Sequence, residues 1–287
     1  MIEASGLPVT VLYAIVFIFG LLVGSFLNVV IYRIPLQLET SWRRDSLDFL
    51  GMEPDSHPAK TPNIVVPASR CPKCGTALKP WHNIPVLSYL FLKGKCASCA
   101  SPISLQYPVV EITCALLTTL VIANDGLTGK AAMILLFSWT LIALTGIDFN
   151  KQLLPDNITL PLLWLGLIAN LNGTFVPLND AVIGAAAGYL VLWSVFWLFK
   201  LITGKEGMGH GDFKLLAALG AWLGWQQLPL IILLSSIVGA VVGITAIIAF
   251  GRDKQIPIPF GPYLATAGWI ALMWGDRITE SYLNLLG

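Results

Sequence analysis

Long apolar runs alternate with short polar segments along most of the chain. Eight of these runs are long enough to cross a bilayer, which requires about 17–25 mainly apolar residues per helix. The sixth run is the weakest, because it is short and rich in Gly and Ala. The pattern predicts an all-α polytopic membrane protein with about eight transmembrane helices. The runs lie near residues 9–34, 108–124, 130–148, 157–172, 181–203, 212–226, 228–250 and 259–275.

The composition agrees with a membrane protein. Charged residues make up 11% of the chain and apolar residues 56%, whereas soluble domains are about 25% charged and 45–50% apolar. A soluble core could not hide this much apolar surface, so lipid must be the solvent for most of it. This excludes a soluble globular enzyme, a disordered chain and a nucleic-acid-binding protein, and it makes the lipid bilayer the expected partner.

One segment, 35–107, differs from the rest of the chain. It is polar, rich in Pro and Lys, and holds four of the five cysteines. A segment of about 70 residues is too long for a connection without structure of its own. We therefore expect a first transmembrane helix at 1–34, a small Cys-rich domain at 35–107 and a seven-helix membrane domain at 108–287.

Basic residues are unevenly divided between the loops. If the spans alternate in direction, fifteen Lys and Arg lie on one side and only Lys130 and Arg277 on the other. Loops rich in Lys and Arg remain in the cytoplasm. The distribution predicts that the N-terminus is outside and that 35–107 is cytoplasmic. The fifteen residues are Arg33, Arg43, Arg44, Lys60, Arg70, Lys73, Lys79, Lys93, Lys95, Lys151, Lys200, Lys205, Lys214, Arg252 and Lys254.

The clustered cysteines form two CxxC pairs, Cys71 with Cys74 and Cys96 with Cys99, separated by 21 residues. Four thiolates from two tight turns satisfy tetrahedral zinc. Two disulfides are the alternative, but thiols in the cytoplasm stay reduced. The spacing predicts a structural zinc site, because four cysteines leave no coordination position open for a substrate.

Few acids lie within or at the ends of the predicted spans, and such residues are candidates for function because a charge in lipid is costly. They are Glu111, Asp148, Asp156 and Asp212. The predicted topology places both Asp148 and Asp212 at the cytoplasmic edge. Two neighbouring carboxyl groups can divide the roles of general base and general acid, which is the chemistry of an aspartic peptidase. Asp156 is expected to cap a helix, whereas Glu111 is either a buried polar partner or part of a second site.

Glycines precede Asp212 at Gly204, Gly207, Gly209 and Gly211. Glycine permits unusual dihedral angles and a close backbone approach, which suits an extended substrate beside the acid. We expect Gly207, Gly209 and Gly211 to form an active-site loop. The alternative for Asp212 is a helix N-cap.

Three Gly-x-x-x-Gly pairs lie inside the apolar runs. Small residues at this spacing let helices approach closely, and we expect these faces to pack within the chain's own helix bundle. The pairs are Gly20 with Gly24, Gly184 with Gly188, and Gly239 with Gly243.

With these motifs the chain resembles the type IV prepilin leader peptidases of type IV pilus and type II secretion systems. The resemblance covers almost the whole length. The matching segments are Gly24-Ser-Phe-Leu-Asn28 through Arg33-Ile-Pro35, the paired CxxC motifs, Ile103-Ser-Leu-Gln-Tyr107 through Glu111, Asp148 with Leu153-Leu-Pro-Asp156, and Gly209-His-Gly-Asp212-Phe-Lys214.

The resemblance implies a bifunctional enzyme of the bacterial inner membrane. Members cleave the short basic leader of prepilins and pseudopilins after a Gly, on the cytoplasmic side, and then methylate the new N-terminus with S-adenosylmethionine. Their two catalytic aspartates correspond to Asp148 and Asp212. The Cys domain of members, which binds zinc where the cysteines are present, is associated with methylation, so the four cysteines here imply both activities. Many relatives carry Arg where this chain has Gln106. If that Arg contacts the cofactor or the substrate, the difference would affect methyl transfer.

Three polar residues of the first spans belong with the methyltransferase side under this interpretation: Asn28, Arg33 and Glu111. For Asn28 and Arg33 the alternatives are polar contacts between helices and an anchor at the membrane interface. The sequence leaves the oligomeric state open.

Two other functions compete with a prepilin peptidase. Another Gly-x-Gly-Asp intramembrane aspartyl protease, of the presenilin kind, would carry Tyr-Asp at the first acid, whereas this chain has Ile147-Asp148. A proton-coupled transporter would place its acids near the bilayer midplane, whereas these are predicted at one edge.

Overall fold

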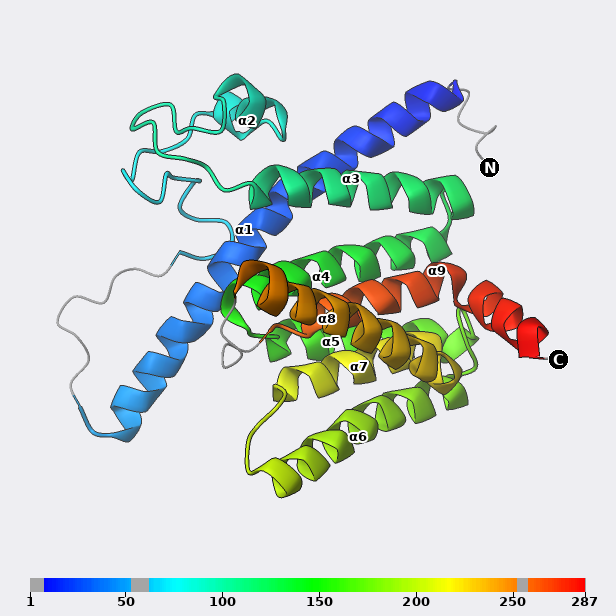
Figure 1. Cartoon of the computed structure of the whole chain (residues 1–287). Helices are drawn as coiled ribbons and strands as arrows, with labels where there is room; N and C mark the ends of the chain where they lie inside the picture. Colours follow the sequence, from blue (N-terminus) through cyan, green and yellow to red (C-terminus); the bar gives the residue numbers. More distant parts are fainter. Residues whose placement is uncertain (1–7, 53–61, 252–257, 287) are drawn as a thin grey trace. The chain divides into compact units, whose positions relative to one another are not determined.

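The computed structural model describes residues 8–52, 62–251 and 258–286 (Figure 1). Within them there is no β-strand, and the pairings Arg70 with Ala77 and Lys95 with Pro102 are isolated bridges. Lys60, Arg252 and Lys254 lie outside the described residues. The α-helices are α1 (Val9–Phe49), α2 (Leu87–Phe91), α3 (Gln106–Asp125), α4 (Gly129–Lys151), α5 (Asp156–Ala169), α6 (Leu178–Thr203), α7 (His210–Leu223), α8 (Leu228–Phe250) and α9 (Gly261–Leu286).

Each of the eight apolar runs corresponds to one helix of 14 residues or more, and the short α2 lies in the Cys-rich segment. Helices α1, α3, α4, α6 and α8 are long and apolar enough to cross a membrane, so the chain is an all-α multi-pass membrane protein. Helices α5 and α7 have 14 residues each, and α1 continues past residue 34 to Phe49. The helix outlasts the apolar run because residues 36–49 contain no further Pro or Gly to break it.

The chain divides into two compact units, Met1–Ala143 and Leu144–Gly287. In the first unit, α1 packs against α3 through glycines. A Cβ atom at Gly20 would lie 2.6 Å from Ala115 Cα, and one at Gly24 would lie 2.6 Å from Glu111 Cα. The absence of a side chain therefore permits direct backbone contact between the two helices.

In the second unit, α7 is the central helix and packs against α5, α6 and α9. Its side chains from Leu215 to Trp222 are all buried. Gly184 and Gly188 of α6 lie against the backbone of Gly220 and Leu216 of α7. The run that looked weakest in the sequence thus occupies the core, because its small residues allow neighbouring helices to approach on several sides.

The third glycine pair also packs within the chain. A Cβ atom at Gly239 of α8 would lie 3.1 Å from Tyr263 Cδ2, and one at Gly243 would lie 3.1 Å from Ile258 Cδ1. The prediction that the three Gly-x-x-x-Gly faces pack within one chain is therefore confirmed.

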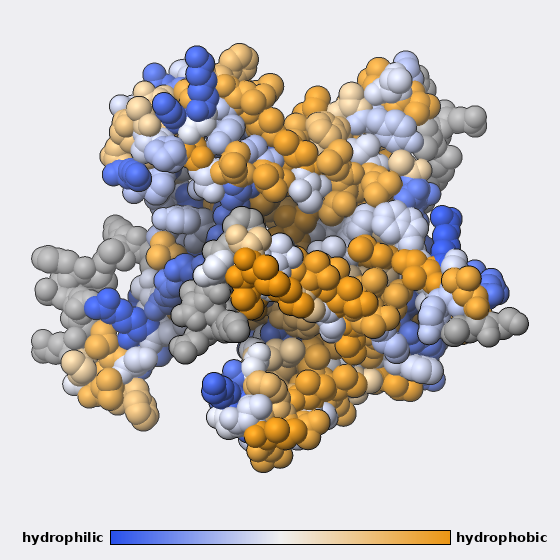
Figure 2. All heavy atoms as spheres, in the orientation of Figure 1, coloured by the Kyte–Doolittle hydropathy of each residue, from blue (hydrophilic) through white to orange (hydrophobic). Residues whose placement is uncertain are grey.

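Helices α6 and α8 carry apolar side chains on their outer faces. Figure 2 shows a continuous hydrophobic surface over each of these two helices. Trp164 is similarly exposed on α5. Exposed apolar surface of this extent is expected on a protein whose solvent is lipid. The residues include Ile183, Leu190, Leu198, Leu201, Leu233, Ile237, Val241, Ile244 and Ile248.

We expect Gly220→Ala to lower the stability of the second unit. A methyl group at this position would overlap the carbonyl group of Gly184, and forcing an extra methyl into a packed core costs about 1–3 kcal/mol. The change should appear as a lower Tm of the detergent-solubilised protein. Gly129→Ala is the matched control, since no atom lies within 4 Å of a Cβ there. Equal Tm values for the two variants would contradict this packing.

Candidate aspartic active site and metal centre

Asp148 lies in the last turn of α4 and its side chain is buried. Its Oδ2 atom accepts a hydrogen bond of 3.0 Å from the backbone N–H of Gly261, the first residue of α9. A Cβ atom at Gly261 would lie only 2.7 Å from this oxygen. Glycine is therefore required at 261 for the carboxylate to reach the start of α9.

Asp212 lies in the first turn of α7 and is also buried. The N-cap residue of this helix is Gly209, not Asp212. The alternative that Asp212 is the N-cap is therefore wrong. Its carboxylate instead accepts a hydrogen bond from the backbone N–H of Gly209, as an acid in the third helical position does in a capping box.

Leu154 connects the surroundings of the two acids. A Cβ atom at Gly211 would lie 2.7 Å from Leu154 Cβ, and one at Gly261 would lie 3.2 Å from Leu154 Cδ2. The two carboxyl groups lie close enough for their charges to interact. Both carboxyl groups thus belong to one site, built from the ends of α4, α7 and α9 and the chain before α5.

An ion pair joins the helices that begin beside this site. Lys214 Nζ on α7 lies 2.6 Å and 2.8 Å from the two carboxylate oxygens of Asp156, the first residue of α5. Pro155, not Asp156, is the N-cap of α5. The expectation that Asp156 caps the helix is therefore wrong, because its carboxylate binds Lys214.

The loop between α6 and α7 packs closely on α6. A Cβ atom at Gly207 would lie 2.8 Å from Phe199 Cε1, and Lys200 Nζ lies 2.8 Å from Glu206 Oε1. Of the loop glycines only Gly204 has a positive φ, of 70°. Gly207 is therefore explained by a close approach and not by its backbone dihedrals.

A Cβ atom at Gly209 would lie 3.7 Å from Asp212 Oδ2, which is ordinary contact. A side chain at Gly209 would therefore begin next to the carboxylate. His210 lies between two aromatic rings, with centroid distances of 5.1 Å to Phe196 and 5.4 Å to Phe213. This contact fixes the start of α7, two residues before Asp212.

The polar residues of the first unit contact backbone groups. Asn28 Nδ2 donates to the carbonyl of Tyr107 on α3 at 3.1 Å. Arg33 Nη1 and Nη2 donate to the carbonyls of Asn63 and Pro67, each at 2.7 Å. Asn28 thus joins two helices, and Arg33 attaches the Cys-rich segment to α1.

Glu111 is buried in α3, and its Oε2 atom accepts a hydrogen bond of 2.8 Å from the backbone N–H of Val86. Val86 has a φ of 58°, which is unusual for a β-branched residue. Glu111 therefore holds a residue with a positive φ immediately before α2. This contact and that of Arg33 attach the Cys-rich segment at two separate points.

The four predicted cysteines come together, with all four Sγ atoms within 4.8 Å of one another. The Cys71 and Cys99 sulfurs are 3.9 Å apart; tetrahedral zinc with Zn–S bonds of about 2.3 Å places its sulfurs about 3.8 Å apart. All four cysteines are free of disulfides. The donor set and its geometry therefore fit a tetrahedral metal ion.

The two CxxC turns have the same hydrogen-bonding pattern. The N–H of Cys71 donates to the Thr76 carbonyl, and the N–H of Cys96 donates to the Ser101 carbonyl. Backbone N–H groups of Cys74 and Lys73 donate to the Cys71 sulfur and lower the pKa of this thiol to about 6. The turn thus stabilises the thiolate form that a metal requires.

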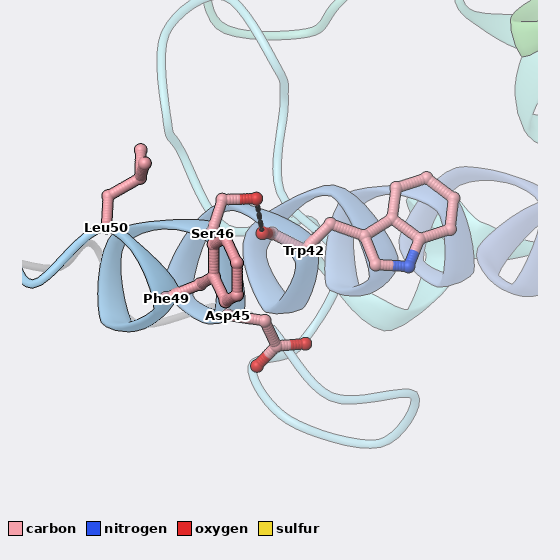
Figure 3. Close-up of a pocket in the computed structure, with 5 residues that line it drawn as sticks. All are labelled: Trp42, Asp45, Ser46, Phe49 and Leu50. Atoms are coloured by element: carbon pink, nitrogen blue, oxygen red, sulfur yellow. Dashed lines mark hydrogen bonds between the residues drawn. The ribbon is translucent and has the colours of Figure 1, made fainter.

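A shallow hollow on α1 lies apart from both sites along the chain. Its lining residues are Trp42, Asp45, Ser46, Phe49 and Leu50. Figure 3 shows these side chains along one end of a single helix, with Ser46 Oγ donating to the Trp42 carbonyl at 2.7 Å. The hollow contains none of the residues that the sequence identifies as candidates, and Asp45 is the one acid among the described residues that line it.

The sequence did not identify Gly261 as a partner of Asp148. The two residues are 113 positions apart, and no local pattern connects them. The sequence does contain the pair Gly261-Pro262 at the start of the last apolar run. Such a pair predicts that a helix begins there. It does not predict which group accepts a hydrogen bond from the Gly261 N–H.

Comparison with known proteins gives two family models that together span most of the chain. The model described as the bacterial peptidase A24 N-terminal domain matches residues 18–124. The model described as the type IV leader peptidase family matches residues 135–244. No solved structure matches the chain.

Several curated relatives carry the name prepilin leader peptidase/N-methyltransferase. The relative from Pseudomonas aeruginosa is 58% identical over 268 residues, covering 93% of this chain and 92% of the relative. The relative from Aeromonas salmonicida strain A449 is 54% identical over 284 residues, covering 99% and 97%. The relative from Xanthomonas campestris is 50% identical over 268 residues, covering 93% of each.

Proposed function

Because the chain belongs to the type IV leader peptidase family, we propose that it is a membrane aspartic endopeptidase that removes the leader of type IV prepilins or pseudopilins after a Gly, and that it N-methylates the new terminus. The observation that carries the peptidase assignment is the pair of buried acids, Asp148 and Asp212, at one site. The two acids are 64 positions apart in the sequence and belong to different helices, α4 and α7.

We assign acid–base roles to this pair. One carboxylate removes a proton from water, whose oxygen attacks the carbonyl carbon of that Gly. The other carboxyl group gives its proton to the leaving amine as the peptide C–N bond breaks. The N–H of Gly261 orients Asp148, and Gly209, which has no side chain, would let an extended substrate approach Asp212 closely.

The placement of the acids favours a peptidase over a proton-coupled transporter. Asp148 lies in the last turn of α4 and Asp212 in the first turn of α7. Both are at helix ends and not in the middle of a span, where transporters bind their ions. A prepilin, whose apolar helix follows a basic leader, would present its scissile bond at such an edge.

For methyl transfer we propose that Asn28, Arg33 and Glu111 are positioning residues of the methyltransferase side. Each contacts a backbone group of the protein, so they fix the segments around them. S-adenosylmethionine supplies the methyl group to the new N-terminal amine. Cys71, Cys74, Cys96 and Cys99 hold structural zinc, in agreement with their tetrahedral spacing.

The uneven charge of the loops supports an orientation in the bacterial inner membrane. We propose that the N-terminus is periplasmic, and that the Cys-rich domain at 35–107 and both acids face the cytoplasm. The membrane parts are then residues 1–34 and 108–287. Residues Lys130 and Arg277 would be the basic residues on the periplasmic side.

The proposed activity is tested by incubating the detergent-solubilised protein with a prepilin and S-adenosylmethionine. We expect a mobility shift the size of the leader, and a mature product heavier by one methyl group. Protein with Asp212→Asn serves as the negative control. Failure of the wild-type protein to produce the shift, under conditions in which a relative cleaves the same prepilin, would refute the proposal.

A further inference from the structure

Residues 63–105, which we call the Cys lobe, carry charge of one sign only. Arg70, Lys73, Lys79, Lys93 and Lys95 are all exposed, and the segment contains no Asp or Glu. A zinc ion with four thiolates has a net charge of 2−, which offsets only part of this positive charge. The lobe therefore remains basic when it holds its metal.

The Cys lobe also exposes large apolar side chains. Trp81, Leu87, Leu90 and Phe91 are 59%, 51%, 64% and 83% exposed, and the last three form most of α2. Lys79 Nζ lies 5.4 Å from the Trp81 ring centroid. Figure 2 shows hydrophilic and hydrophobic residues side by side over this lobe. Basic residues next to exposed aromatic and aliphatic groups are typical of segments that lie in a membrane interface.

Two contacts hold this surface near the ends of apolar helices. Arg33, at the end of the first apolar run, donates to the carbonyls of Asn63 and Pro67. Glu111, in the second turn of α3, accepts the N–H of Val86, the residue directly before α2. Helix α2 therefore begins beside the first turns of α3, one of the helices long and apolar enough to cross a membrane.

We propose that the Cys lobe docks on the anionic headgroups of the surrounding bilayer, with α2 lying in the interface. Its lysines would bind lipid phosphates, while Trp81, Leu90 and Phe91 would enter the boundary with the acyl chains. The basic leader of a prepilin would be repelled by the same charges. Negatively charged lipid is thus the partner that can contact both the basic and the apolar side chains of this surface.

The test is hydrogen exchange, measured by mass spectrometry, on the full-length protein in nanodiscs. One set contains phosphatidylcholine alone, and the other also contains phosphatidylglycerol. We expect the amides of residues 87–95 to exchange at least about threefold more slowly with the anionic lipid. High salt should remove this difference, because it screens interactions between exposed charges.

The variants separate charge from apolar contact. Lys79→Gln with Lys95→Gln should abolish the protection, whereas the matched pair Lys130→Gln with Arg277→Gln, which removes the same charge elsewhere, should retain it. Leu90→Ser with Phe91→Ser should also reduce it. An unchanged zinc content and unchanged exchange at residues 71–74 would show that the lobe of each variant is folded.

Two outcomes would overturn the proposal. One is equal exchange of residues 87–95 in neutral and anionic nanodiscs. The other is protection that appears only when a prepilin is added, because this would assign the surface to a peptide. Neither outcome depends on leader cleavage, so failure of this proposal is distinguishable from failure of the proposed function.

Discussion

Replacing Asp212 with Asn is expected to reduce leader cleavage by roughly 10³-fold or more, since a positioned acid or base contributes about 10²–10⁴-fold and this residue has no substitute at the site. Asn has nearly the same shape as Asp but cannot transfer a proton at neutral pH. Asp148→Asn should have a similar effect. Its side-chain oxygen can still accept the N–H of Gly261, so this variant should fold.

The rate of cleavage of a prepilin by purified variants measures this effect. If the two acids act as one unit, the double variant should lose little more activity than either single variant. Asp156→Asn is the control among nearby acids, because it removes only a partly exposed ion pair with Lys214, worth about 0–1 kcal/mol. Cleavage by either active-site variant at close to the wild-type rate would contradict the assignment.

Removing the metal from the Cys lobe is expected to unfold that lobe while the membrane helices remain intact. Structural zinc contributes an apparent 10–16 kcal/mol or so in small zinc domains. Described residues of the Cys lobe bury few large apolar side chains, so the lobe has little core to replace this energy. Cys71→Ser with Cys96→Ser should therefore abolish zinc binding and expose the lobe to trypsin at its lysines.

Cys114→Ala is the matched control, because this cysteine is fully buried in α3 and belongs to neither CxxC turn. It should retain the metal and the protease resistance of the wild-type lobe. Metal content and digestion rates of the three proteins are compared. With prepilin present, the metal-free protein should still cleave but should methylate poorly. A lobe that resists trypsin equally well without metal would contradict a structural role for zinc.

Much of the helical architecture was readable from hydropathy, because lipid requires each span to be continuously apolar. The eight runs correspond to α1 and to α3 through α9. Their surroundings were not readable. Helix α7 is deeply buried although its run is the weakest. Small residues such as Gly220 lower the hydropathy of the run, but they let neighbouring helices pack closely against it.

Part of the candidate site was also predictable, because its residue types and their spacing stand out in the sequence. Asp148 and Asp212 are conspicuous because acids are rare near apolar runs, and the spacing of the two CxxC pairs identifies four cysteines that could hold a metal. The roles of Arg33 and Glu111 in holding the Cys lobe were not predictable, because their partners are backbone groups. Backbone groups are present at every position and leave no mark in a sequence.

By itself the sequence determined the helical class, and it identified the four candidate metal ligands and the two candidate acids, because each depends on residue type and local spacing. Only the tertiary structure decided that Gly261 orients Asp148, that Gly209 and not Asp212 is the N-cap of α7, and that Asp156 binds Lys214. These contacts join residues distant in the chain, or depend on where a helix begins. They are set by the packing of helices and not by any local pattern.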